Sequence, residues 1–381
     1  MRKSYLVVQL LGLLSAAAPR LSKCGNKLLE PCFCGEQFVD QSTMFVVNCT
    51  NTGFTNTDVL LDLPEQTEVL IFSGNHIPSL PSNLFGENAY MSRLKVIDLT
   101  NNGIREIRGK TFHHVANVER LVLDHNNISI ADEEDKNFHH PRVFSNFVNL
   151  QELHLTNAFA DNTDSALADD LHDIFVNSNL TKLYKLHLEQ NEIKNFKDET
   201  VFCDLPDLHD LHLGDNDIPS LNFDVTCLRK LRYLDLEFNN ITEFTQRELD
   251  ALDALATSPG REENLQVEVN GNPLKCESVI RRFYPWTQTS RVQVRHLENL
   301  ECAQAKYGKK YPVKVMSLIE SRHVKISQSL TVLLAVLLCV LISLMVAYFY
   351  LKRDQMRSRF SPILEAITRK VQYTTIEAQD V

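Results

Sequence analysis

The stretch LYKLHLEQNEI, residues 183–193, decides the fold, because its spacing recurs along the chain. The spacing is L-x-x-L-x-L-x-x-N-x-L. Its central L-x-L alternates at a period of two, which predicts a short strand with one buried face. The Asn follows the strand, where its amide can bond backbone groups of its own turn and of the next repeat. The other copies are LKVIDLTNNGI (94–104), VERLVLDHNNI (118–128), LHDLHLGDNDI (208–218) and LRYLDLEFNNI (231–241).

This spacing is the signature of leucine-rich repeats, which stack because one repeat cannot bury its apolar face alone. Aligned on the Asn, residues 61–272 hold about eight repeats. The predicted fold is an α/β solenoid, a leucine-rich-repeat horseshoe with N- and C-terminal disulfide caps and one transmembrane helix. Insertions are expected at 130–147, 159–180 and 245–262, the last two with helical periodicity and the first acidic.

Both ends of the chain carry membrane signals. Residues 1–17 resemble a signal peptide, with Arg2 and Lys3 before an apolar run and small residues. Residues 330–351 hold no charge and are long enough to cross a bilayer as a helix. The tail, 352–381, begins with basic residues, as on a cytoplasmic side. We therefore expect a single-pass type I plasma-membrane protein with its N-terminus outside the cell.

The composition excludes several functions. The formal charge of −10 argues against nucleic acid as a partner, because a phosphate backbone binds basic surfaces. No nucleophile elbow, zinc-protease motif or phosphate loop occurs, so we expect neither an enzyme nor a cofactor.

The cysteines indicate an oxidising compartment. An N-terminal cysteine cap is expected over residues 24–60 and a C-terminal cap over 273–310, followed by a juxtamembrane stalk at 311–329. Cys203 and Cys227 hold similar places in successive repeats, which predicts a third kind of bridge on the convex side. The alternative is two buried thiols.

Three features resemble one family more closely than the repeats alone do. The central repeat LQELHLTNAFA (150–160) lacks the Asn and precedes an insertion with a helix. The span ends in YFYLKR (348–353), and the chain ends in Asp380 and Val381. In these features the chain resembles the trophoblast glycoprotein, or Wnt-activated inhibitory factor, family. The resemblance implies a surface protein that inhibits Wnt/β-catenin signalling.

The resemblance also implies cysteine pairs. In such caps the first cysteine pairs with the third and the second with the fourth. The C-terminal cap departs from the family in keeping only two of four cysteines, which would remove one whole bridge. The pairs implied are Cys24–Cys34, Cys32–Cys49 and Cys276–Cys302, beside Cys203–Cys227 from the spacing.

The concave face of the horseshoe is the expected protein-binding surface. Outward strand positions and their neighbours include three histidines that would stack one per strand, about 4.8 Å apart. One hypothesis is that they sense pH or bind zinc; the other is that they form a solvated polar strip. The candidate residues are Asp98, Asp124, His154, Lys185, His187, Glu189, His212, Tyr233, Asp235 and Glu237.

Modification and tail motifs complete the expectations. N-glycosylation sequons occur at Asn48, Asn127, Asn179 and Asn240. Val381 could fit the pocket of a PDZ domain by strand addition, although Gln379 stands where the family has Ser.

Two functions remain open from the sequence. The first is inhibition of Wnt/β-catenin signalling through an extracellular protein ligand or a Wnt-pathway receptor component. The second is cell adhesion or neuronal guidance, through a protein on another cell.

Overall fold

The computed structural model describes residues 21–87, 91–129, 143–160, 164–261, 263–306 and 309–352, with residues 365 and 367. The chain forms two compact units, Met1–Val315 and Met316–Val381, and each is described by itself. The expected signal peptide, most of the acidic insertion at 130–147 and the PDZ-like Val381 lie outside the described residues.

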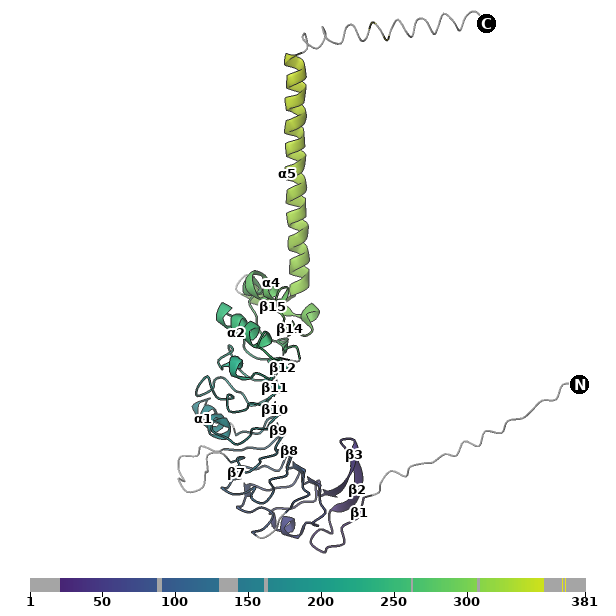
Figure 1. Ribbon diagram of the computed structural model, residues 1–381, viewed down its shortest axis with the longest axis vertical. Coiled ribbons are helices and arrows are strands. Elements are labelled where there is room, and N and C mark those ends of the chain that lie inside the picture. The colour runs from purple at the N-terminus through teal and green to yellow at the C-terminus, as the bar shows by residue number, and fades with distance from the viewer. Residues whose placement is uncertain are drawn as a thin grey trace, which may run out of the picture. The chain divides into compact units, whose positions relative to one another are not determined.

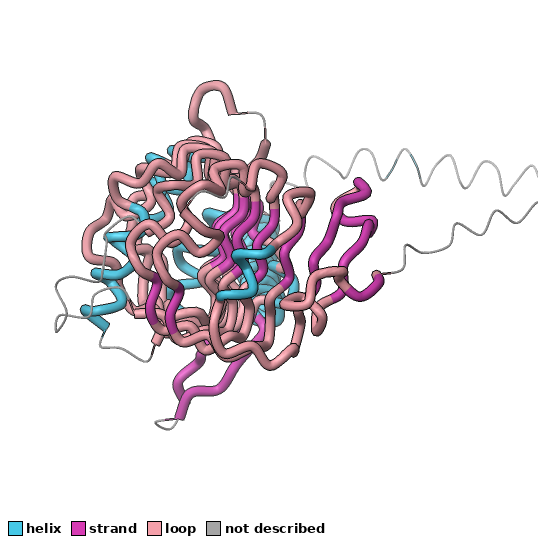
Figure 2. The backbone as a smooth tube through the Cα atoms, turned by 90° about the horizontal axis from the view of Figure 1, so that it is seen from below, coloured by secondary structure: helices cyan, strands magenta, loops and turns pink. Residues whose placement is uncertain are grey.

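The first unit is built on one sheet of twelve strands. Each repeat contributes a strand of three residues whose middle residue is buried, because the L-x-L pattern turns one Leu inward. The repeat strands pair in parallel and in register (Figures 1 and 2). The sheet runs through β1 (Ser22–Lys23), β2 (Phe33–Val39), β3 (Ser42–Asn48), β4 (Val69–Ile71), β6 (Val96–Asp98), β8 (Arg120–Val122), β9 (Glu152–His154), β10 (Lys185–His187), β11 (Asp210–His212), β12 (Tyr233–Asp235), β13 (Gln266–Glu268) and β14 (Gln293–Val294).

The repeated Asn holds neighbouring coils together. The Nδ2 of Asn191 donates to the carbonyls of Leu155 and Leu188, at 2.7 and 2.9 Å. Its Oδ1 accepts from the N–H groups of Ala158 and Phe159, at 2.9 and 3.3 Å. The side chain is buried, so these bonds satisfy backbone groups that water does not reach.

The repeat without the Asn uses backbone instead. Ala158 is fully buried, and its carbonyl accepts from the N–H of Ile128 at 2.8 Å. Ala160 returns a bond to the Ile128 carbonyl at 2.9 Å, which makes a parallel bridge between Ile128 and Phe159. This bridge joins the two coils where the amide is missing.

The residue before each ladder Asn has a left-handed backbone. Asn101, His125 and Asp215 have φ of +54°, +56° and +53°, a region that short polar residues tolerate. Phe238 has φ +50° and is exposed. Its ring lies where a Cβ on Gly271 (φ +77°) would stand, so this glycine is required by both conformation and space.

The convex side is packed by aromatic rings and helices. Phe85, Phe112 and Phe202 are fully buried there, as a packing spine requires. Helices α1 (Asp164–Phe175) and α2 (Gln246–Ala256) lie across the solenoid from the strands (Figures 1 and 2). The α2 helix begins with a capping box between Thr245 and Glu248 and buries Leu249, Leu252 and Leu255.

Short elements complete the first unit. The only Trp of the chain, Trp286, donates from Nε1 to the Asp253 carboxylate at 2.8 Å and so ties the C-terminal cap to α2. Ser79–Leu80 (β5) pairs with Glu106–Ile107 (β7), and Glu301–Lys306 (β15) with Lys309–Lys314 (β16). The others are η1 (Asp58–Asp62), η2 (Val225–Cys227), α3 (Cys276–Ser278), η3 (Val279–Phe283), α4 (Tyr284–Thr287) and η4 (Leu297–Asn299).

Four disulfides cross-link this unit. Two lie in the N-terminal cap, one joins neighbouring coils on the convex side, and one closes the C-terminal cap. They are Cys24–Cys34, Cys32–Cys49, Cys203–Cys227 and Cys276–Cys302, the pairs expected from the sequence.

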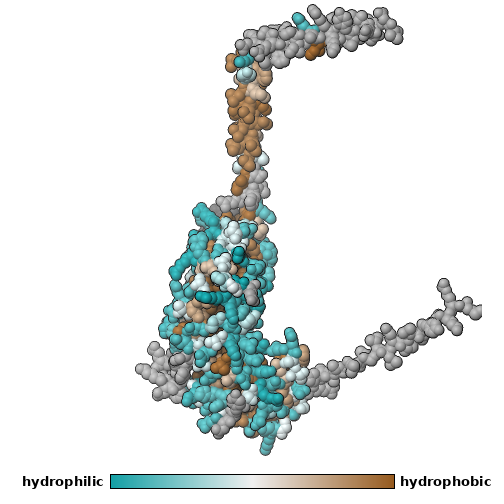
Figure 3. Space-filling model, in the orientation of Figure 1, coloured by the Kyte–Doolittle hydropathy of each residue, from teal (hydrophilic) through white to brown (hydrophobic). Residues whose placement is uncertain are grey.

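One long helix, α5, begins at Val315, the last residue of the first unit, and ends at Leu351 in the second. Its part Gln328–Leu351 is apolar and long enough to cross a membrane, as Figure 3 shows in brown. The segment 311–329, expected as a stalk, instead continues β16 and then enters α5. No Gly or Pro interrupts residues 315–351, so the helix starts earlier than the apolar run.

Candidate binding face

A strip of mostly polar side chains runs along the strand face of the solenoid. Figure 1 shows the row of strands that carries it. The third residue of each repeat strand points outward, opposite the buried Leu, and aligns with its counterpart in the next strand. We call these residues and their neighbours the concave strip. Its aligned members are Asp98, Val122, His154, His187, His212, Asp235 and Glu268, the last of them buried.

Three histidines stack at the centre of the concave strip. The rings of His154 and His187 lie 4.3 Å apart between centroids, and those of His187 and His212 lie 4.2 Å apart. The Nδ1 of His187 is 2.9 Å from Oε1 of Glu189. Burial opposes the charge of Glu189, but the hydrogen bond with His187 lowers the pKa of its carboxyl. The central strip therefore carries an ionised carboxylate against imidazoles.

An ionic link lies at the N-terminal part of the strip. The Nε of Arg120 is 2.6 Å from Oε2 of Glu152, and its Nη1 is 2.8 Å from Oδ2 of Asp40. A hydrogen bond with His154, with Arg120 beside it, lowers the pKa of Glu152 to about 2. Asp40 stands in the turn between β2 and β3, so this link reaches from the cap hairpin to the repeats.

The C-terminal part of the strip is aromatic and acidic. Burial raises the pKa of Tyr233 to about 12, and the guanidinium of Arg295 lies 5.5 Å from its ring centroid. Burial also raises the pKa of Glu237, helped by Glu268. Glu268 itself is covered by His296 at 2.7 Å, so it does not belong to the open surface.

The remaining candidates lie on the same face. Lys185 is half-buried beside the histidines. Burial raises the pKa of Asp124, whose carboxylate accepts from the N–H of Thr156 at 2.8 Å. Asp98 accepts from Thr100 at 2.9 Å, and Asp235 from Glu237 at 2.9 Å. Asp98 and Asp235 therefore hold their own turns, whereas Asp124 is bonded to the next repeat.

The sequence places Glu152 and Asp210 on the concave face, but sequence reasoning missed the basic residues that pair with them and so connect strands. Arg120 and Glu152 align across β8 and β9, so opposite charges at equal repeat positions were the available signal. No comparable signal pointed to Asp40, which lies in the cap. The bidentate pair of Arg232 with Asp210, at 2.8 and 3.0 Å, was missed in the same way.

The sequons differ in exposure. Asn127, Asn179 and Asn240 are exposed. Asn48 is half-buried, beside the disulfide at Cys49, and its Oδ1 accepts from the N–H of Thr50 at 2.9 Å.

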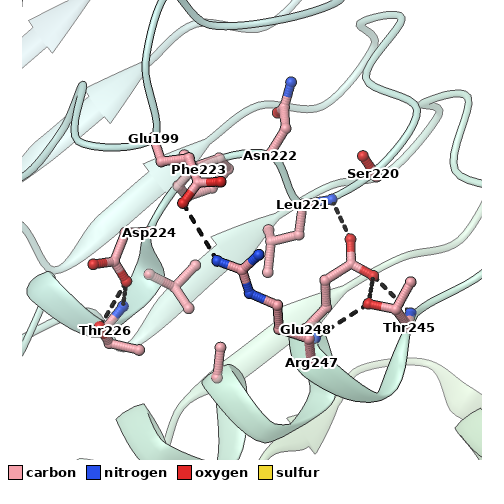
Figure 4. Close-up of a pocket in the computed structure, with 12 residues that line it drawn as sticks. Glu199, Ser220, Leu221, Asn222, Phe223, Asp224, Thr226, Thr245, Arg247 and Glu248 are labelled. Atoms are coloured by element: carbon pink, nitrogen blue, oxygen red, sulfur yellow. Dashed lines mark hydrogen bonds and ion pairs between the residues drawn. The ribbon is translucent and has the colours of Figure 1, made fainter.

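A separate cleft lies between η2 and α2, and Figure 4 shows the residues that line it. Most of its polar groups already bind one another: Glu248 accepts from Leu221 at 2.8 Å, and Arg247 pairs with Glu199 at 3.5 Å. Because these groups are paired within the protein, no ligand is needed to account for their positions. The concave strip is therefore the stronger candidate.

Comparison with known proteins identifies the repeats. A family model described as leucine rich repeat matches residues 65–128, 92–158 and 181–241. Trophoblast glycoprotein of Macaca fascicularis is 24% identical over 268 residues, which cover 68% of this chain and 60% of that protein. Lumican of Homo sapiens is 26% identical over 219 residues, covering 55% and 62%. The chain thus spans about 60% of the length of these relatives.

A solved structure supports the fold. The crystal structure of human trophoblast glycoprotein, also named Wnt-activated inhibitory factor 1, aligns with a TM-score of 0.58 at 23% identity. The alignment covers 71% of this chain and 92% of that one. The chain is a leucine-rich-repeat solenoid, and it resembles trophoblast glycoprotein in both sequence and fold.

Proposed function

We propose that this leucine-rich-repeat membrane protein, similar to trophoblast glycoprotein, binds an extracellular protein through its concave strip and thereby inhibits Wnt/β-catenin signalling. The observation that carries the proposal is the in-register strip itself. It presents charged and aromatic side chains from successive strands on one curved, rigid face. Such a face suits a folded protein partner better than a small molecule, because its contacts are spread over many strands.

The orientation belongs to the same proposal. Four disulfides lie in the repeat unit, and disulfides persist in oxidising compartments. Three exposed sequons, at Asn127, Asn179 and Asn240, lie on that unit too. We place the unit outside the cell and the tail inside, with residues 1–17 as a signal peptide. Glycans at these three sites are expected, and Asn48 is the least accessible.

The Wnt part of the proposal comes from the resemblance. A structural neighbour bears the name Wnt-activated inhibitory factor 1, and a receptor component of that pathway would be the partner. A partner for Val381 among PDZ proteins stays a separate prediction.

A reporter assay tests the proposal. Cells expressing the full chain should show a lower Wnt/β-catenin reporter signal than cells without it. Lys185→Glu, on the concave strip, should restore the signal. Arg247→Glu is the matched control, because it makes the same charge change on the exposed surface of α2 and should inhibit like the wild type.

Two results contradict parts of the proposal. If the wild type leaves the reporter unchanged while its expression makes cells aggregate, adhesion to a protein on another cell replaces Wnt inhibition. If both variants inhibit equally at equal surface expression, the concave strip is not the binding face.

A further inference from the structure

His187, Glu189 and His212 form a cluster that the proposed function does not require. Both histidines stand at paired positions of β10 and β11. Their Nδ1 atoms approach the same oxygen, Oε1 of Glu189, at 2.9 and 3.6 Å. All three candidate ligand atoms lie within 4.8 Å of one another. Ligands about 2.1 Å from a tetrahedral ion stand about 3.4 Å apart, so the cluster needs little contraction to enclose one.

A further hydrogen bond fixes the orientation of the Glu189 carboxylate. Thr156 donates from Oγ1 to the other oxygen of Glu189, Oε2, at 3.0 Å. The N–H of Thr156 in turn donates to Asp124 at 2.8 Å. Oε1 is thus turned toward the imidazoles, in the way that outer hydrogen bonds orient a metal-binding carboxylate.

We propose that His187, Glu189 and His212 bind one Zn²⁺ ion on the concave strip. Imidazole nitrogen and carboxylate oxygen are ligands that zinc prefers, whereas Ca²⁺ and Mg²⁺ take about six or more oxygens. Two histidines and one Glu leave the fourth position of the ion open to water or to a side chain of a bound protein. The site stands independently of the proposed function, because the ion needs no partner to bind.

Binding requires one ring to turn. The His187 and His212 rings are only 14° from parallel, and a nitrogen lone pair lies in the plane of its ring. Both Nδ1 atoms can therefore face one ion only after a rotation about a Cβ–Cγ bond. His187 is stacked on both sides, by His154 and His212. His212 has Tyr233 on its other side at 5.2 Å and tilted, so His212 is the ring that turns.

Without the ion, His187 is hydrogen-bonded to the Glu189 carboxylate, and the Nδ1 of His212 lies 3.6 Å from the same carboxylate oxygen. The two states differ in a measurable way. Zinc should separate the stacked rings of His187 and His212 and shift the ring NMR signals of both, with Mg²⁺ leaving them unchanged.

Isothermal titration of the untagged full chain in detergent micelles with ZnCl₂ tests the site. His187→Ala and His212→Ala should each weaken the tightest zinc-binding step by more than about 100-fold, and Thr156→Val by about 10–100-fold. His209→Ala is the matched control, because that ring also stacks, on Tyr184 at 4.3 Å, and its loss should leave zinc affinity unchanged.

Circular dichroism of each variant checks folding, and Glu189→Gln provides a variant of unchanged size that should also lose zinc. The inference is wrong if the wild type takes up no zinc at about millimolar concentration, or if the His187, Glu189 and His212 variants all bind like the wild type. Zinc titration measures neither partner binding nor the Wnt reporter signal. The zinc site and the proposed function can therefore be refuted separately.

Discussion

Replacement of Asn191 by Ala should destabilise the solenoid more than the same change in an ordinary repeat. Asn191 makes three buried hydrogen bonds of 2.9 Å or less, to Leu155, Leu188 and Ala158. At about 1 kcal/mol net for each, their loss costs about 3 kcal/mol, and orphaned buried groups add to it. We expect Asn191→Ala to lower the free energy of unfolding by about 3–4 kcal/mol.

The matched comparison is Asn216→Ala. The Leu188 carbonyl accepts from both Asn216 and Asn191, at 2.9 Å each, so it keeps a partner when Asn216 is lost. In an ordinary repeat the Leu155 carbonyl would also accept from the Asn side chain at position 158. That residue is Ala, so Asn191 is the side-chain donor to this carbonyl. Asn191→Ala therefore leaves one more buried carbonyl unpaired, and it should cost about 1 kcal/mol more than Asn216→Ala.

Guanidinium unfolding of the full chain in detergent, followed by the fluorescence of Trp286, measures these differences. Trp286 is the only Trp and is buried in the C-terminal cap, so α5 does not contribute to the signal. Asn299→Ala, an exposed position, should change stability by less than about 0.5 kcal/mol. The reasoning fails if Asn191→Ala costs no more than Asn216→Ala.

Three further predictions use the same measurement. Replacing both Cys203 and Cys227 by Ala opens a loop whose ends are 24 residues apart and should lower the free energy of unfolding by about 3 kcal/mol. Reducing the disulfides of the wild type should bring its free energy of unfolding closer to that of the double variant. The pKa of Glu152 is lowered from 4.5 to about 2, so its stabilisation is complete above pH 4.5 and is lost as the pH falls toward 2. Allowing for solvent at this partly exposed side chain, the wild type should lose about 1–2 kcal/mol more than Glu152→Gln over that range, and parallel pH curves would contradict this. Gly271→Ala should cost about 1–3 kcal/mol, and the cost should shrink in a Phe238→Ala background; an unchanged cost would show that the ring is not the obstacle.

The repeat pattern predicted the parts of the molecule that depend on local periodicity. Leu153 and Leu186 are inward because the strand alternates, and the aligned histidines stack because equal repeat positions become neighbours. The helical insertion expected over 245–262 is present as α2, which begins after the capping residue Thr245.

Other parts depend on contacts that periodicity does not encode. The gap at Ala158 was visible, but the bridge between Ile128 and Phe159 depends on how the backbone closes over it. The helix start at Val315 was missed because the hydropathy of the span, rather than the lack of helix breakers, set the expected boundary. The position of Glu189 between two histidines depends on side-chain rotamers and on Thr156.

The link from Asp40 to Arg120 also has a mechanical meaning. It joins the cap hairpin to β8, with β4 and β6 lying between β3 and β8 in the sheet, and so cross-links two separated strands on the concave side. Flattening the N-terminal part of the solenoid would pull Asp40 and Arg120 apart. Since the Asp40 side chain is 49% exposed, salt screens the pair, and its contribution is at most about 1 kcal/mol. The N-terminal part of the solenoid should therefore change its curvature more easily at high ionic strength than at low ionic strength.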